Sequence, residues 1–240
     1  PRTFSSAASD VYKRQILLLC SQVQDLLSKV LAQFGLKFLV LFCLMPYIDI
    51  NHLPHYAKFM TNLFLRHAEV LNKKNIQYAN LPGFQISDKG KEQSVAAGKL
   101  LKNSNKKIQK IITSPLLRAR ETSSIISEIL KTPIFISSNL TEWTGINNWI
   151  GKTIVEIKSS KEYLERKSSL DLSPVEETLK SVYERVAIEY NNNVNTLFIS
   201  HQDTIRAFTY FFTNDENFSM YRPDNCEIQF IENNIVRTLT

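Results

Sequence analysis

The sequence has little of what metal and redox sites need. Its three cysteines, Cys20, Cys43 and Cys226, form neither a Cys-x-x-Cys pair nor a zinc-ligand spacing. An odd cysteine count of this kind indicates no disulfide framework and no structural zinc, and favours a reducing, cytoplasmic compartment. The DxDxG, HExxH and Walker-type GxxxxGK[ST] motifs are absent as well. We therefore expect a site that needs no metal and no cofactor.

Long hydrophobic runs are also lacking. The apolar run at 38–45 is eight residues long, whereas a membrane-spanning helix needs about 20 residues. Extending this run back to residue 30 includes Gln33 and Lys37, and a charge in mid-span is costly. We expect no membrane partner, and an N-terminal signal anchor is the minor alternative.

Acidic residues are too few to balance the basic ones. The chain carries 29 Lys and Arg against 23 Asp and Glu, a formal charge of +6, with a pI of about 9.1. Six basic and three acidic side chains lie in residues 1–59, so half of the excess belongs to the first quarter. The remaining excess is too small and dispersed to follow a nucleic-acid backbone, and we expect no nucleic-acid partner.

The first quarter differs from the rest of the chain. Residues 1–15 resemble translated library-adapter sequence, and 16–48 is rich in apolar residues with partly helical spacing. Met60 directly precedes an apolar, strand-like run. We therefore interpret 1–59 as an N-terminal extension outside the catalytic domain, which we place at 60–240. No feature points to a particular oligomeric state.

Within 60–240, strand-like segments alternate with helical patterns. This alternation predicts an α/β fold with a mostly parallel sheet between helices. Asn233-Asn234 is typical of a hairpin turn within 226–239. The predicted strands are 62–66, 108–113, 133–137 and 195–200, and the predicted helices are 88–102, 115–131 (opened by Pro115) and 174–190 (opened by Pro174).

Two histidines follow predicted strands directly. His67 lies in LFLRHAE and His201 lies in LFISHQD, each directly after the apolar strand residues. Both are therefore expected at the carboxyl ends of parallel strands, where open α/β sheets bind ligands. Arg66 precedes the first histidine. Arg118 and Arg120 lie two residues apart in a helical turn, so only one of them is expected to face the strand ends. Arginine suits a phosphate because it donates two parallel hydrogen bonds.

These residue types together favour phosphoryl transfer. A neutral imidazole can attack phosphorus and split one displacement into two easier steps, while arginines and a second histidine stabilise the charge. A carboxylic acid must still protonate the departing oxygen. Glu142, just after the third predicted strand, is the candidate by position, and Glu69 is its competitor.

Four segments, taken in order, resemble the signature blocks of the histidine phosphatase (phosphoglycerate mutase-like) superfamily. They are LFLRHAE at 63–69, SPLLRARET at 114–122, LTE at 140–142 and FISHQDTIRAF at 198–208. The resemblance implies a three-layer α/β/α sandwich with a mostly parallel central sheet. It also implies His67 as the phosphorylated nucleophile, Arg66, Arg118 and His201 as the phosphate pocket, and Glu142 as the proton donor.

The short segment after Glu142 looks closer to the small phosphatase branch than to the mutases. The resemblance therefore implies a metal-independent phosphomonoesterase that acts on a small phosphorylated metabolite. A phosphoglycerate mutase and a phosphohistidine protein phosphatase are the related alternatives. Ala68, Lys73 and Gln202 depart from the family pattern, and Gln202 is expected to contact the substrate. These departures keep a non-catalytic phosphate-binding module as a further alternative.

Overall fold

The computed structural model describes residues 61–161, 177–213, 222–232 and 235–240. All of them belong to one compact unit, Lys58–Thr240. The predicted extension 1–59 lies outside the described residues, and so does the anchor alternative. Within the described residues, no helix is long and apolar enough to cross a membrane.

A six-stranded sheet forms the middle of the unit, in the order β3-β2-β4-β1-β5-β6. The first four of these strands run parallel, and β5 and β6 add an antiparallel edge beside β1. The strands are β1 (Leu63–Arg66), β2 (Lys110–Thr113), β3 (Ile134–Ile136), β4 (Thr196–Ser200), β5 (Ile228–Glu232) and β6 (Ile235–Thr238).

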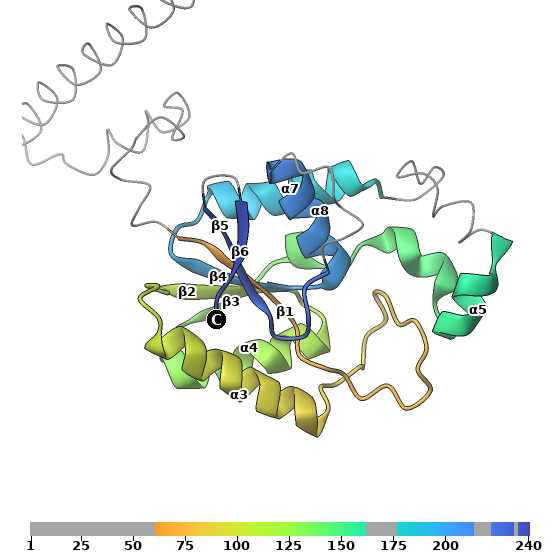
Figure 1. The fold of residues 1–240 in the computed structure, drawn as a ribbon, viewed down its shortest axis with the longest axis horizontal. Coiled ribbons are helices and arrows are strands. Elements are labelled where there is room, and N and C mark those ends of the chain that lie inside the picture. Colours follow the sequence, from red (N-terminus) through yellow and green to blue (C-terminus); the bar gives the residue numbers. More distant parts are fainter. Residues whose placement is uncertain (1–60, 162–176, 214–221, 233–234) are drawn as a thin grey trace, which may run out of the picture. The chain divides into compact units, whose positions relative to one another are not determined.

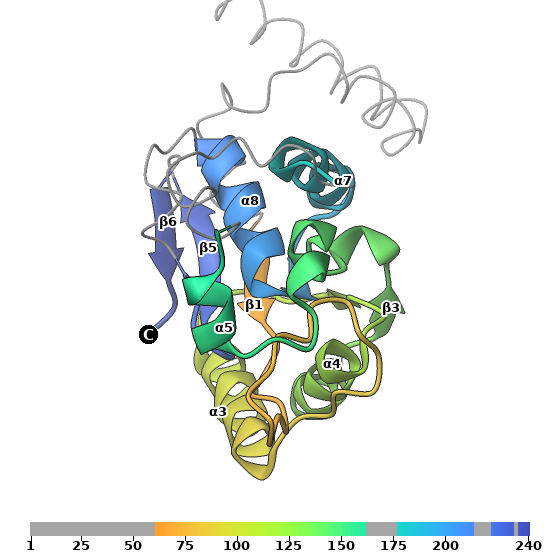
Figure 2. The same ribbon diagram turned by 90° about the vertical axis from the view of Figure 1, so that its right-hand side faces the viewer.

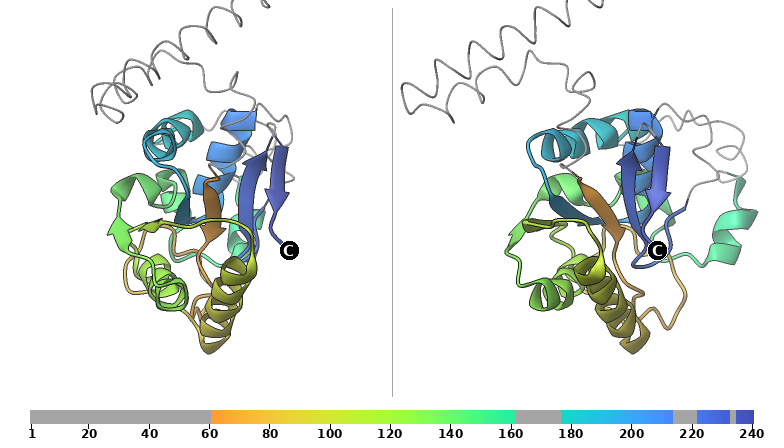
Figure 3. Two further views of the ribbon diagram at one scale, coloured as in Figure 1. Left: turned by 90° about the vertical axis from the view of Figure 1, so that its left-hand side faces the viewer. Right: turned by 60° about the vertical axis from the view of Figure 1, so that its left-hand side comes forward.

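Helices cover both faces of this sheet. Figure 1 shows α7 and α8 above it and α3 and α4 below it, and Figures 2 and 3 show the same separation from other sides. The helices are α3 (Asp88–Asn103), α4 (Leu117–Leu130), α5 (Ile154–Ser159), α7 (Leu179–Asn191) and α8 (Gln202–Thr213), with 3₁₀ turns η4 (Ser138–Leu140) and η5 (Thr144–Trp149). The predicted three-layer sandwich is confirmed.

The alternation of side chains along β1 explains the two cores. Leu63 and Leu65 are buried with the apolar residues of α3 and α4, whereas Phe64 is buried with those of α7 and α8. Successive side chains of a strand point to opposite faces, so a strand covered on both faces reads as a continuous apolar run. The same reasoning applies to β4, which is buried throughout.

Two predicted helix starts are displaced. Pro115 was expected to open a helix, but α4 begins at Leu117 because the Ser114 hydroxyl accepts from the Leu116 N–H and holds 114–116 in a turn. Thr178 caps α7, its hydroxyl accepting from the Ser181 N–H, so this helix begins after the predicted start. Pro174 lies outside the described residues, as does the Asn233-Asn234 turn, although the antiparallel pairing of β5 and β6 agrees with a hairpin.

Candidate active site

His67 and His201 meet at one edge of the sheet. β1 and β4 are neighbouring parallel strands with Arg66 opposite Ser200, so the next residue of each strand leaves the sheet at the same point. The His67 N–H donates to the Ser200 carbonyl at 2.9 Å. The two imidazole rings lie 5.1 Å apart between centroids, at 60°. Both residues are buried. They follow neighbouring parallel strands directly, as the sequence pattern predicted.

The hydrogen bond of His67 defines which ring nitrogen is free. Its Nδ1 lies 2.8 Å from the Ala68 carbonyl oxygen. A carbonyl can only accept, so Nδ1 carries the proton and Nε2 keeps its lone pair. Burial, reinforced by the positive charge of Arg118, holds the pKa of His67 well below its usual value. The ring is therefore a neutral imidazole with a free nitrogen, which is the form that a nucleophile requires.

Arg118 lies in the first turn of α4 and is almost completely buried, at 1% exposed. Its Nη2 donates to the Ala79 carbonyl at 2.5 Å and its Nη1 to the Leu81 carbonyl at 3.3 Å, and its guanidinium lies 4.8 Å from the Tyr78 ring centroid. Its Nε is buried and has no hydrogen-bond partner. The Nε–H of a fixed guanidinium is therefore left for a ligand.

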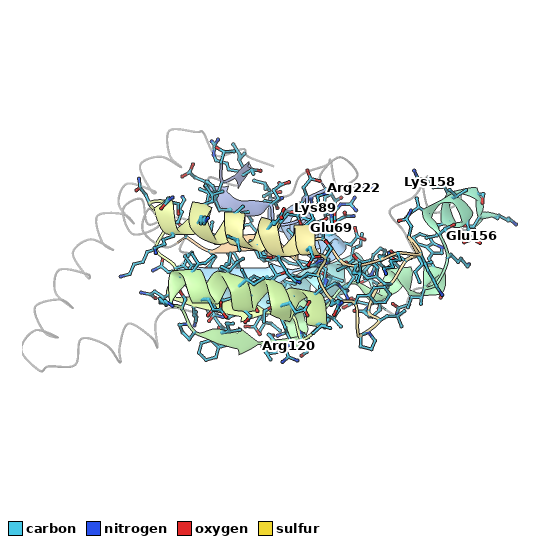
Figure 4. All side chains as sticks on the ribbon, turned by 90° about the horizontal axis from the view of Figure 1, so that it is seen from below. Glu69, Lys89, Arg120, Glu156, Lys158 and Arg222 are labelled. Carbon is cyan, nitrogen blue, oxygen red and sulfur yellow. The ribbon has the colours of Figure 1, made fainter. Side chains whose placement is uncertain are left out.

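Arg120 behaves differently from Arg118. It is exposed on α4, where Figure 4 labels it. The expectation that only one of the two arginines faces the strand ends is confirmed. The reason is the helix geometry, because residues two apart on a helix point about 200° apart around its axis.

Arg66 is held by a segment that the sequence pattern did not indicate. Its Nη1 donates to the Pro223 carbonyl at 2.9 Å, while its Nε is buried without a hydrogen-bond partner. Next to Pro223, the Asn225 side chain donates to the His67 carbonyl at 2.8 Å, and the Cys226 N–H donates to the Arg66 carbonyl at 2.9 Å. The segment 223–226 thus fixes both residues at the end of β1.

Glu142 is buried close to this group. One carboxylate oxygen, Oε1, accepts from the Trp143 N–H at 2.9 Å and lies 3.3 Å from the Thr204 hydroxyl. Burial, assisted by the negative charge of Asp203, raises the pKa of Glu142 to about 7. A carboxyl group that keeps its proton near neutrality can act as a general acid.

Glu69, the competitor for the acid role, has a different environment. Its side chain is partly exposed and forms an ion pair with Lys89 at 2.9 Å, and Figure 4 labels the two near the start of α3. The hydrogen bonds from Lys89 and Ser87 lower the pKa of Glu69. It is therefore ionised near neutrality and carries no proton to donate.

The first turn of α8 completes the site. Gln202 is its first residue and is partly buried. Asp203 is partly buried and forms an ion pair with Arg206 at 2.5 Å, which holds its negative charge close to Glu142. Sequence reasoning missed Tyr78, Asn225 and Asp203. Of these three, only Asp203 could have been suspected from the sequence, because it lies two residues after His201.

The described residues hold no cluster of three or more His, Cys, Asp or Glu side chains that could bind a metal. What they hold is a neutral imidazole, two arginines with spare donors, a second imidazole and a carboxyl group whose pKa is raised to about 7. This set can bind an anion with tetrahedral oxygens, attack its centre and protonate a departing group.

Several solved structures share this fold. A phosphoserine phosphatase from Entamoeba histolytica, in complex with 3-phosphoglyceric acid, has a TM-score of 0.63 at 17% identity, covering 75% of this chain and 96% of its own. A mycobacterial glucosyl-3-phosphoglycerate phosphatase gives 0.60 at 19% identity, covering 71% and 89%. A second mycobacterial protein, a hydrolase, gives 0.63 at 19%, covering 75% and 96%.

A search of curated proteins returned no match. A family model, however, matches residues 63–234, a span that contains all four segments noted in the sequence. The chain therefore belongs to the histidine phosphatase superfamily, branch 1.

Proposed function

We propose that this protein is a phosphatase that hydrolyses phosphate monoesters through a phosphohistidine at His67. The observation that carries the proposal is the state of His67, a buried neutral ring whose Nδ1 is committed to the Ala68 carbonyl and whose Nε2 is free. Around it stand Arg66, Arg118 and His201, each with a buried nitrogen that has no hydrogen-bond partner.

The first step forms the phosphoenzyme. The Nε2 lone pair of His67 attacks phosphorus, the N–P bond forms and the ester P–O bond breaks. Glu142 passes its proton to the departing oxygen, so the alcohol leaves neutral. The two guanidinium groups and His201 face the oxygens of the transferring group, whose charge they stabilise without rearrangement.

The second step releases phosphate. Glu142, now a carboxylate, takes a proton from water, and the hydroxide attacks phosphorus as the N–P bond breaks. His67 returns to the neutral ring and Glu142 to the protonated acid. One residue thus serves as acid and then as base, which its pKa of about 7 favours.

The substrate class that we propose is a small phosphorylated metabolite. Two similar structures support it by name, a phosphoserine phosphatase and a glucosyl-3-phosphoglycerate phosphatase. Gln202, at the start of α8, is then a residue that contacts the part of the substrate beyond the phosphate. We further propose a cytoplasmic location, on the cysteine usage alone; Cys226, which is free, is the only cysteine within the described part of the chain.

The test compares two esters whose leaving groups differ in basicity. The full chain should hydrolyse p-nitrophenyl phosphate and phenyl phosphate, and His67→Ala should abolish both reactions, with Arg120→Ala as the matched control. Glu142→Gln should impair phenyl phosphate far more, because the more basic phenolate needs the proton. Acid-labile phosphate on the wild-type protein, absent from His67→Ala, identifies the intermediate.

The same assays decide among the alternatives. Conversion of 3-phosphoglycerate to its isomer only when a bisphosphate primer is present would replace the phosphatase with a mutase. Preference for a phosphohistidine protein over every small ester would point to a protein phosphatase. A chain that binds phosphate but forms no phosphoenzyme would be a binding module, and the proposal would be wrong.

A further inference from the structure

Ser114 contacts His201 at the edge of the phosphate pocket. It follows β2 directly, and its backbone N–H donates to Ile199 of β4. Its hydroxyl oxygen lies 2.8 Å from Nε2 of His201, and both residues are completely buried. Only one hydrogen lies between this buried hydroxyl oxygen and the buried ring nitrogen. Whether that hydrogen is bonded to the oxygen or to Nε2 decides the tautomer of the ring.

The other contact of the Ser114 hydroxyl indicates which atom carries this hydrogen. Its oxygen already accepts from the Leu116 N–H at 3.3 Å. If Nε2 of His201 also donated to it, the oxygen would accept twice and the hydroxyl hydrogen would have no acceptor among the described residues. If the hydroxyl instead donates to Nε2, both of its roles are satisfied. Buried polar groups in folded proteins are overwhelmingly satisfied, which favours the second arrangement.

The second arrangement places the hydrogen of His201 on Nδ1. That atom is buried and has no hydrogen-bond partner, and its ring neighbours the ring of the nucleophile at 5.1 Å. Burial and the nearby Arg118 hold the pKa of His201 well below its usual value, so the ring is neutral and has a single hydrogen to offer. A lone pair on Nδ1 would repel a phosphoryl oxygen, whereas an N–H would bind it.

We propose that Ser114 is a positioning residue, whose hydroxyl donates to Nε2 of His201 and so presents the Nδ1–H of that ring to a phosphoryl oxygen. The inference rests on the proposed function only for the identity of the anion. It makes the two histidines alike in tautomer, since both carry hydrogen on Nδ1, and opposite in role, since one offers a lone pair and the other a hydrogen.

The direct test is NMR of the full chain labelled with ¹⁵N-histidine. Long-range ¹H–¹⁵N spectra distinguish an Nδ1–H ring from an Nε2–H ring, and the His201→Gln variant identifies the signal. We expect Nδ1–H in the wild type. A wild-type His201 protonated on Nε2 overturns the inference, whatever any Ser114 variant does.

The variant test uses inorganic phosphate as the probe. Ser114→Ala should shift His201 toward Nε2–H and weaken phosphate binding by about tenfold to a hundredfold, the loss expected when a hydrogen bond to a charged group is broken. Ser114→Thr, which keeps the hydroxyl, should restore the wild-type tautomer if it folds. Ser123→Ala is the matched control, because Ser123 is equally buried on α4 but donates to Arg120.

An Ala variant that keeps both the tautomer and the phosphate affinity of the wild type also overturns the inference. Neither readout requires turnover. Failure of the proposed function would show separately, as a wild-type protein that binds phosphate but hydrolyses no ester.

Discussion

The Thr204 hydroxyl lies 3.3 Å from Oε1 of Glu142 while it donates to the Thr141 carbonyl at 2.7 Å. This contact holds the first turn of α8 against the acid. It brings Asp203, the residue before Thr204, close enough for its charge to raise the pKa of Glu142. Arg118 and Arg66 lower this pKa through their positive charges, and Tyr78 also interacts with Glu142.

The pH dependence of activity tests the effect of Asp203. Because Glu142 must be protonated to donate, turnover of phenyl phosphate should fall as the pH rises through about 7. Asp203→Asn removes the negative charge that raises the pKa of Glu142, and this change favours the carboxylate form of Glu142. We therefore expect the alkaline limb of the kcat profile to move to lower pH. Asp88→Asn, an exposed carboxylate on α3, should leave it in place. An unmoved limb in Asp203→Asn would contradict the assignment.

The stability of the protein should carry two opposing pH effects. The folded-state pKa of Glu142 is raised from 4.5 to about 7. Its contribution to the free energy of unfolding is therefore fully present at low pH and lost as the pH rises through 7. The pKa values of His67 and His201 are lowered below 6.5, so their contribution is present above that pH and lost as the pH falls.

Glu142→Gln removes one of these effects and leaves the other. Between pH 7.5 and 5.5, the variant should lose on the order of 2 kcal/mol more unfolding free energy than the wild type. Urea unfolding at the two pH values measures this difference. Glu69→Gln is the control, because the pKa of Glu69 is lowered and the group stays ionised across this range. Equal pH dependence in Glu142→Gln and the wild type would rule the effect out.

Gly90 allows α3 to approach the loop after His67. A Cβ at this position would lie 2.2 Å from the Glu69 carbonyl oxygen, which is backbone and cannot rotate away. Gly90→Ala should therefore destabilise the protein by about 1–3 kcal/mol and reduce kcat/KM, since the displaced segment begins two residues after His67. Gly98→Ala in the same helix meets the flexible end of Ile129 and should cost less. Thermal unfolding and kinetics of both variants check the contrast.

Asn225 should matter more for activity than for stability. Its side chain donates to the His67 carbonyl at 2.8 Å, and losing one such bond costs about 1 kcal/mol of stability. A shift of the backbone that carries His67, the proposed nucleophile, is much more damaging to activity, because catalysis depends on near-attack geometry. We expect Asn225→Ala to lower kcat at least tenfold with little change in melting temperature. Asp224→Ala, at an exposed neighbouring position, should do neither.

The elements that end in the site could be predicted because their patterns are strong. Apolar runs buried on both faces identified β1 and β4, and the residues that follow such strands had to meet at one edge. Helix geometry alone left open whether Arg118 or Arg120 faces the strand ends, and the family resemblance implied Arg118. In the structure Arg118 is buried and Arg120 is exposed.

The contacts that hold the arginines could not be predicted. Arg118 and Arg66 are held by the carbonyls of Ala79, Leu81 and Pro223. Every residue has a backbone carbonyl, so the side chains at these three positions do not indicate in the sequence that they hold an arginine. The effect of Asp203 on Glu142 was hidden for another reason, since it depends on how α8 packs against a segment about 60 residues away in the chain.

The carbonyl contacts of Arg118 have a consequence for how the protein can change. Replacing Ala79 or Leu81 changes a side chain but keeps the carbonyl oxygen that holds the guanidinium. Leu81 is only partly buried and can therefore vary in sequence without loss of this contact, whereas Ala79 is packed in the core, which leaves little room for a larger side chain. The position of the Arg118 guanidinium is thus anchored to the main chain and does not depend on which side chain stands at position 81.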